Sequence, residues 1–242
     1  MMNSRKWVGL RAAAAASLFV CLGIATAPAQ QPDDTSVIQM VDAAVKARVD
    51  HLAGYTVTEH YAVYRDGDES HPAAEMTVKT TYNKESGKSY AILSSSGSEL
   101  IRKFVLDPLL ENEKALNLPG NRESSWITSA NYDFKLKPGG PQPTDGRACL
   151  ALALTPRRKA PNMIEGTLWV DAKDGTIVRL DGIASKSPSV FTGPAHMMRQ
   201  YVNMSGYGMA THARAESASF LFGRTVVTIE YLDYQMQLLP VK

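Results

Sequence analysis

From Asp33 onward the hydrophobic residues first recur with the period of an α-helix. Val37, Val41 and Val45 are four residues apart, which places them on one face of a helix. The acidic and hydroxyl side chains that precede Val37 suit the positive end of a helix dipole. The pattern predicts one amphipathic helix that begins after Asp33 and ends near Gly54.

After this helix the period changes to two residues, as in a β-strand with one buried face. Tyr55, Val57, Tyr61 and Val63 share a face, and a turn follows at residues 65–68. Similar alternation predicts further strands, which cover residues 76–82, 89–93, 100–106, 126–136, 147–155, 165–171, 176–183, 197–204, 211–219 and 224–238.

Two local signals modify this series of strands. Asp107 and Pro108 offer an N-cap and a proline at the first helical position, and they predict a short central helix that runs to Pro119. In the last strand the apolar positions shift by one residue between Tyr231 and Tyr234, which predicts a β-bulge.

Together these elements predict a mainly β (α+β) fold. We expect a single, strongly curved antiparallel sheet of roughly nine to eleven strands, a half-barrel covered by the N-terminal helix and the short central helix. The chain lacks the alternation of strand and helix that a parallel sheet needs. Hydrophobic residues make up 44% of the sequence, enough for a real core, and we expect one domain over residues 30–242.

Residues 1–29 have the pattern of a secretory signal peptide. Three cations stand in the first eleven residues, an apolar stretch follows over 12–27, and Ala29 ends a small-residue cleavage site. We expect cleavage after Ala29 and secretion of the remaining chain into the periplasm. The alternative is a retained membrane anchor, which Gly23 and Pro28 disfavour.

Cleavage would change the charge of the protein. The full sequence carries 26 basic and 24 acidic side chains, a net charge of +2, and loss of the three leading cations leaves 23 against 24, or −1. A near-neutral chain without Lys/Arg runs lacks the basic patch that binds nucleic acid or anionic lipid. We therefore expect no nucleic-acid partner.

Cys149 is the only cysteine outside the predicted signal peptide, so no internal disulfide can form after cleavage. It lies in an apolar, strand-like run at 148–152, where a free cysteine usually behaves as a small buried hydrophobe. A reactive thiol is the alternative, but no neighbouring cation is evident to lower its pKa.

The sequence contains no recognisable catalytic or metal-binding motif. The five histidines lack ligand spacing, and no nucleophile elbow, phosphate loop or dinucleotide fingerprint occurs. The acidic turn at 66–69 is too short for an EF-hand loop, which favours a solvated turn over a Ca²⁺ site. We therefore predict no catalytic residue, no metal, no cofactor and no enzymatic activity.

Glu59 is the one acidic side chain that the alternation places on a core face, beside Val57 and Tyr61. A buried carboxylate could serve as a general acid, or it could be satisfied by a tyrosine or an arginine. No second carboxylate is identified as its catalytic partner, which favours the structural interpretation.

The strands supply a large apolar surface for a curved sheet to enclose. Such a surface either packs on the helices or lines a cavity for a hydrophobic ligand, and the residues alone leave both possibilities open. The candidate cavity residues are Trp126, Tyr132, Phe134, Leu150, Leu152, Leu154, Leu168, Val170, Val178 and Leu180.

Two sequence motifs resemble those of the LolA-like superfamily of periplasmic proteins. The predicted hairpin reads GTLWVD at 166–171 and DGTIVR at 174–179, and YLDY at 231–234 is similar to the family's closing strand. The superfamily includes outer-membrane lipoprotein-sorting proteins and the N-terminal domain of the RseB/MucB envelope-stress regulators.

This resemblance implies a half-barrel whose concave apolar face accepts the acyl chains of lipids or lipoproteins. The implied function is that of a periplasmic, non-enzymatic carrier or binding protein for such a hydrophobic ligand. The alternative is an envelope sensor or interaction module that binds a membrane-protein partner. Lipoprotein carriers use an arginine to hold a lid closed, and no single position of this sequence corresponds to that arginine.

Overall fold

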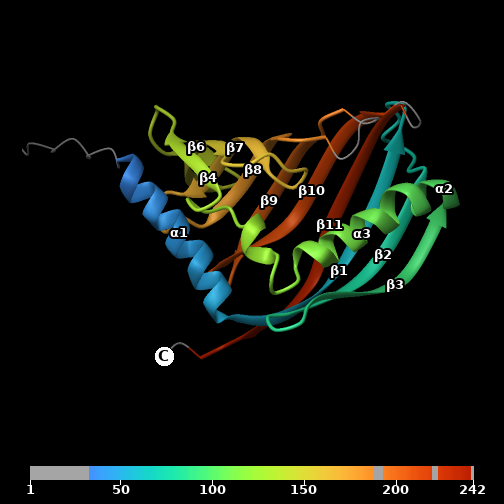
Figure 1. Cartoon of the computed structure of the whole chain (residues 1–242), viewed down its shortest axis with the longest axis horizontal. Helices are drawn as coiled ribbons and strands as arrows, with labels where there is room; N and C mark the ends of the chain where they lie inside the picture. The colour runs from blue at the N-terminus through green and yellow to red at the C-terminus, as the bar shows by residue number, and fades with distance from the viewer. Residues whose placement is uncertain (1–32, 188–192, 220–222, 241–242) are drawn as a thin grey trace, which may run out of the picture. The chain divides into compact units, whose positions relative to one another are not determined.

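A computed structural model of the chain describes residues 33–187, 193–219 and 223–240, and shows eleven strands in one open antiparallel sheet (Figure 1). This architecture confirms the predicted mainly β, curved sheet with few helices. The order across the sheet is β3-β2-β1-β11-β10-β9-β8-β7-β6-β4, and β5 pairs with β6. The strands are β1 (Leu52–Arg65), β2 (Ala74–Asn83), β3 (Gly87–Gly97), β4 (Tyr132–Leu136), β5 (Gln142–Thr144), β6 (Arg147–Pro156), β7 (Ile164–Asp171), β8 (Ile177–Ala184), β9 (His196–Met204), β10 (Tyr207–Ser219) and β11 (Gly223–Leu238).

The N-terminal helix α1 (Asp34–His51) forms where its pattern predicts it. The Asp33 side chain accepts a hydrogen bond of 2.8 Å from the backbone N–H of Ser36, which caps the first turn. Val37 and Val41 are fully buried against the sheet. β1 begins directly at Leu52, so the helix ends slightly before the predicted boundary.

The predicted bulge is present in β11. Thr56 pairs with Gln235 and Thr58 pairs with Leu232, so β11 uses one more residue than β1 over the same interval. Asp233 lies inside this interval with a φ of 55°, a left-handed conformation that lets the strand change its phase. The bulge therefore lies opposite the first part of β1.

Residues 100–106, predicted as a strand, are helical instead. A continuous helical run comprises α2 (Glu99–Ile101), the π-helical turn η1 (Arg102–Leu106) and α3 (Asp107–Leu116). Ser98 caps this run, since its Oγ accepts a hydrogen bond from the N–H of Ile101 at 3.4 Å. The predicted central helix is therefore correct in kind but starts earlier.

The error has a physical cause in the spacing of the apolar residues. Ile101, Leu106 and Leu110 are all buried, and steps of four and five residues place them on one side of a run that contains a π-turn. Pro108 lies inside this run rather than at its start. A proline cannot donate to the preceding turn, and the π-turn directly before it accommodates that loss.

The segment predicted as a strand from residue 126 becomes one only at Tyr132. Residues before it form the 3₁₀ turn η2 (Arg122–Ser125) and a loop. The hydroxyls of Ser124 and Ser125 donate hydrogen bonds to backbone carbonyls three residues earlier, at 2.7 and 2.8 Å. Within the predicted strand itself, the backbone N–H groups of Asn131 and Tyr132 both donate to the Thr128 carbonyl at 3.0 Å, and this local turn takes the place of strand pairing.

Two helical covers, α1 and the α2–η1–α3 run, lie over the sheet (Figure 1). Each covers one hydrophobic core, and a third, smaller cluster consists of Leu52, Tyr55, Val57 and Met209. One core joins Val37 and Val41 of α1 to buried residues of β4, β6, β7 and β8. The other joins the α2–η1–α3 run to β1, β2, β10 and β11. The middle of the sheet, where β9 crosses between them, belongs to neither core's fully buried set.

The described residues all belong to one compact unit. The predicted signal peptide, residues 1–29, lies outside the described residues. Among the described helices, none is long and apolar enough to cross a membrane.

Candidate functional site

One row of paired residues crosses the inner face of the sheet at its centre. Every member is apolar except Arg199 on β9, which pairs with Leu180 on one side and Ala213 on the other. From β4 to β2 the row reads Leu136, Leu152, Leu168, Leu180, Arg199, Ala213, Ile229, Tyr61 and Met76. A single cation therefore stands in the middle of an otherwise apolar stripe.

The ten predicted cavity residues fall mostly in the core under α1, where Val37 and Val41 cover them. Val178 is buried outside the three main clusters, and Trp126 lies in the loop before β4. Their role in ligand binding stays a prediction. The residues that join α1 in its core are Tyr132, Phe134, Leu150, Leu152, Leu154, Leu168, Val170 and Leu180.

A buried ion pair lies under the other cover, between the sheet and α3. Lys88 Nζ on β3 and Glu113 Oε2 on α3 are 2.9 Å apart, with side chains only 12% and 28% exposed. The Lys88 ammonium lowers the pKa of Glu113 to about 2, against the opposing effect of burial. Burial opposes the charge on Lys88, but the Glu113 carboxylate outweighs it and raises the Lys88 pKa.

Glu59 is 2% exposed, so its predicted place on the core face of β1 is correct. Its Oε2 accepts a hydrogen bond of 2.5 Å from the hydroxyl of Tyr61. Burial raises the pKa of Tyr61, and the charge of Glu59 raises it further. The tyrosine partner matches the structural interpretation of this residue. Glu59 pairs across the sheet with Val78 and Tyr231, and neither neighbour is a second carboxylate.

Arg199 is half-buried and forms no ion pair within 4.0 Å among the residues that the structure describes. Burial disfavours its charge, but Tyr231, Tyr201 and Glu113 around it raise its pKa above the ordinary value. Tyr201 lies two residues along β9, on the same face, and Tyr231 lies on β11. The guanidinium thus stays charged with polar hydroxyls close by.

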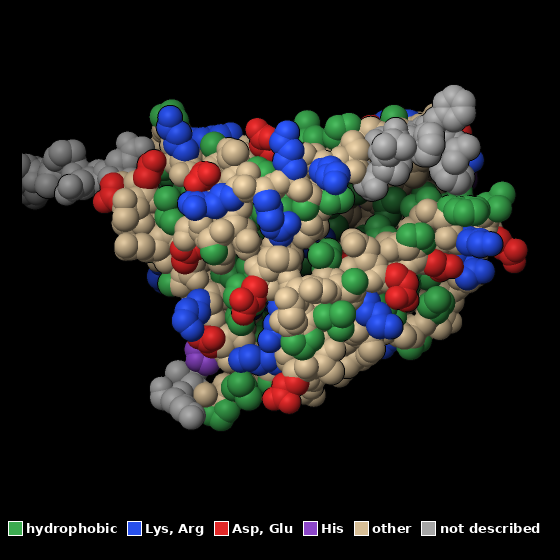
Figure 2. Space-filling model, viewed as in Figure 1, with side chains coloured by type: hydrophobic (Ala, Val, Ile, Leu, Met, Phe, Trp, Pro, Cys, Tyr) green, Lys and Arg blue, Asp and Glu red, His purple; other side chains and the backbone are tan. Residues whose placement is uncertain are grey.

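The surface is hollowed beside the α2–η1–α3 run (Figure 2). A groove of about 510 Å³ lies between β3 and the run, and its apolar walls are Tyr90, Ile92 and Leu110. Arg102, Asp107, Glu111 and Lys114 of the run, together with Ser89, supply its polar lining. Tyr90 and Leu110 also belong to the hydrophobic core beneath, so the groove borders the inner face of the sheet.

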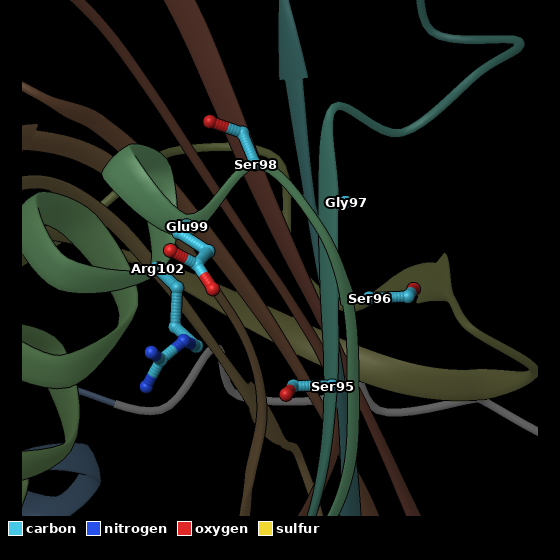
Figure 3. A pocket seen from close by; sticks show the side chains of 6 residues that line it. All are labelled: Ser95, Ser96, Gly97, Ser98, Glu99 and Arg102. Atoms are coloured by element: carbon cyan, nitrogen blue, oxygen red, sulfur yellow. The ribbon is translucent and has the colours of Figure 1, made fainter.

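A second, smaller depression of about 180 Å³ lies where β3 passes into α2 (Figure 3). It is lined by Ser95, Ser96, Gly97, Ser98, Glu99 and Arg102. These small and polar groups do not match an acyl chain, which requires an apolar wall.

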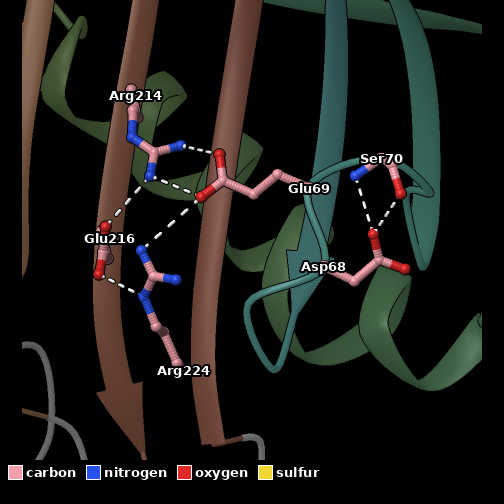
Figure 4. Close-up of polar contacts among 6 residues, drawn as sticks. All are labelled: Asp68, Glu69, Ser70, Arg214, Glu216 and Arg224. Carbon is pink, nitrogen blue, oxygen red and sulfur yellow. Dashed lines mark hydrogen bonds and ion pairs between the residues drawn. The ribbon is translucent and has the colours of Figure 1, made fainter.

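The acidic turn after β1 takes part in an ion-pair network on the outer face of the sheet (Figure 4). Glu69 accepts two hydrogen bonds from Arg214, at 2.7 and 3.0 Å, and lies 3.7 Å from Arg224. Glu216 binds both arginines, at 3.1 and 2.6 Å. These contacts fasten the turn to β10 and β11.

The free cysteine has a structural environment, and no metal-binding cluster accompanies it in the described residues. Cys149 is fully buried, and burial raises the pKa of its thiol, as expected for a structural cysteine. In the described part of the chain, no group of three or more His, Cys, Asp or Glu could hold a metal ion.

Sequence reasoning identified Glu59 but missed Arg199, Lys88 and Glu113. A signal for Arg199 was available, because it shares the strand phase of Met197 and Tyr201, both of which pack on a hydrophobic core. Lys88 and Glu113 are 25 residues apart, and only the helical nature of the central run brings them together.

No protein-family model matches the chain, and no curated protein matches it in sequence. Solved structures with a similar fold include a domain named as an outer membrane lipoprotein-sorting protein from Vibrio parahaemolyticus, which is 11% identical with a TM-score of 0.47. The match covers 83% of this chain and 92% of that one.

A DUF1329 family protein from Desulfovibrio piger is 14% identical with a TM-score of 0.44, over 87% of this chain and 96% of that one. A LolA superfamily protein from Nitrosomonas europaea is 12% identical with a TM-score of 0.41, over 86% and 96%.

Proposed function

We propose that the protein is a non-enzymatic, periplasmic carrier or binding protein for a hydrophobic ligand. The ligand class is an acyl chain of a lipid or a lipoprotein, held on the inner face of the sheet between α1 and the α2–η1–α3 run. The predicted signal peptide supports a periplasmic location.

One observation carries this proposal. Between the two cores, inner-face side chains remain half-buried although they lie on the covered side of the sheet; Met197, Tyr201 and Tyr231 are examples. Apolar and aromatic side chains in such a place gain free energy when a ligand removes their remaining contact with water.

The energetics suit an acyl chain. Burial contributes roughly 0.8 kcal/mol per methylene, so a chain of about ten methylenes supplies on the order of 8 kcal/mol before the costs of association. In this proposal Leu180, beside Arg199, ends the binding surface, while the other predicted cavity residues under α1 form its supporting wall.

Native mass spectrometry of protein purified from the periplasm, combined with titration of the neutral fluorescent probe N-phenyl-1-naphthylamine, tests this function. We expect co-purifying lipid and saturable probe binding. Absence of both in the wild-type protein would refute the proposal.

Two adjacent methionines of β9 provide matched variants. Met197 lies on the inner face and packs on the core under α1. Met198 lies on the outer face and pairs with Arg214 and Asp181, and both methionines are half-buried. Met197→Asp should abolish probe binding, and Met198→Asp should retain it. Equal effects of the two substitutions would place the ligand elsewhere.

A specific observation also favours the second candidate, an interaction module that binds a membrane-protein partner. Leu100 and Phe104 are 64% and 56% exposed and lie four residues apart on the helical run. If this surface binds a partner, Phe104→Asp should abolish cross-linking to a membrane protein without changing probe binding. Unchanged cross-linking would refute this candidate.

A further inference from the structure

We infer that the ligand is an anionic amphiphile, whose carboxylate or phosphate head group binds Arg199 while its chain lies along the apolar inner face. This inference rests on the proposed function and specifies the ligand class for the same site.

The position of Arg199 provides the first argument. It is the only charged member of the central row, and its partners across the sheet are Leu180 and the small Ala213. Burial of a guanidinium among apolar neighbours costs desolvation energy, which a bound anion would offset.

The charge pairing of the inner face provides the second argument. Lys88 has Glu113 at 2.9 Å, and Glu59 has the Tyr61 hydroxyl at 2.5 Å. Arg199 has no carboxylate within 4.0 Å in the described ranges. Half-buried charges are normally paired, so a carboxylate or phosphate from outside the chain would complete this one.

The chemistry around Arg199 explains why the head group should be an oxyanion. A guanidinium presents its N–H donors in a planar fork that matches two oxygens of a carboxylate or phosphate. The hydroxyls of Tyr201 and Tyr231 can donate to the same anion. Glu113 acts electrostatically on Arg199 and would repel a bound anion, but its ion pair with Lys88 at 2.9 Å offsets part of that repulsion.

Displacement of N-phenyl-1-naphthylamine by three twelve-carbon ligands tests the inference on the full chain. Dodecanoate and dodecyl phosphate carry the two candidate head groups, and dodecanol carries none. We expect the preferred anion to bind about ten- to a hundredfold more tightly than dodecanol, the range for charge-assisted hydrogen bonds. The ratio of the two anions distinguishes a carboxylate from a phosphate ligand.

Three variants assign this preference to Arg199. Arg199→Met should reduce the preference to within about threefold while dodecanol still binds, and Arg199→Lys should restore part of it. Arg157→Met is the matched control, because Arg157 is an exposed residue paired with Asp133 at 2.9 Å. It should leave all three affinities unchanged.

The outcomes separate the two levels of the proposal. If the wild-type protein binds all three ligands within about threefold, or if Arg199→Met keeps the preference, the anionic inference is wrong while the proposed function stands. If none of the three displaces the probe, the proposed function itself fails. Should Arg199→Met not fold, the wild-type preference and Arg199→Lys still decide the inference.

Discussion

Polar side chains on the inner face of the sheet differ in how they are stabilised. The Lys88–Glu113 pair bridges β3 and α3 with a contact of 2.9 Å, in addition to the hydrophobic core that holds the helical run on the sheet. Removal of one member of a buried pair leaves an uncompensated charge, whereas removal of both can be neutral.

Lys88→Met should therefore destabilise the protein by about 2–4 kcal/mol, because Glu113 then remains under the cover without its cation. The double variant Lys88→Met/Glu113→Leu should recover most of this loss. Urea denaturation of both variants measures the effect. A double variant as unstable as the single one would show that the pair is not the source of the cost.

Glu113 also predicts a dependence of stability on pH. Its pKa is lowered from 4.5 to about 2 in the folded state, so its contribution is complete above pH 4.5. That contribution is lost as the pH falls toward 2. The difference in unfolding free energy between wild type and Glu113→Gln should shrink over this range, and a difference that stays constant would contradict the low pKa.

Sequence patterns predict the placement of some of these inner-face residues and not of others. Alternation on one strand is enough to place Glu59 inside, because burial there depends only on local phase. The Lys88–Glu113 pair depends on a tertiary contact between a strand and a helix, and no local pattern contains that information. For Arg199 the phase that it shares with Met197 and Tyr201 was an available signal, but a charged residue is not expected on an apolar face from hydropathy alone.

Among the elements, the hairpin of β7 and β8 is the one that the sequence specifies best. Its turn ends at Gly175, which has a φ of 73° and lies directly against α1, where an added Cβ would be 2.5 Å from the Met40 carbonyl carbon.

The α2–η1–α3 run was predicted poorly, because the apolar residues from Leu100 to Leu106 satisfy both a strand pattern and a helix with a π-turn.

Gly166 and Gly182 pair within the hairpin of β7 and β8 and lie close together. A Cβ added at Gly166 would be 2.2 Å from the Asp181 carbonyl oxygen. Gly166→Ala should therefore destabilise the protein by about 1–3 kcal/mol, since backbone must move to accept the methyl group. Gly120→Ala, whose Cβ would meet no atom within 4 Å, is the control, and equal unfolding midpoints would refute the steric account.

At the scale of the whole described body, the core under α1 and the core under the α2–η1–α3 run are both filled by side chains of the chain itself. The proposed function assigns stability to these cores and ligand binding to the half-buried inner surface between them, which includes Met197, Tyr201 and Tyr231. An apolar inventory read from the sequence could not make this division, because buried and half-buried apolar residues share the same strand phase.

Val41→Ala tests this division, because Val41 is fully buried under α1. We expect a loss of about 1–3 kcal/mol in unfolding free energy from the cavity left behind. Affinity for N-phenyl-1-naphthylamine should not change. A large loss of affinity in the folded variant would place the ligand under α1 instead.

The most direct test of the binding site is photo-cross-linking with a fatty acid that carries a diazirine in its chain, followed by peptide mass spectrometry. The proposed function predicts cross-links to inner-face residues of β9 and β11, near Tyr201 and Tyr231, and to α3. Cross-links confined to the outer face of the sheet, near Met198 or Arg214, or no cross-linking above that of a denatured control, would contradict it.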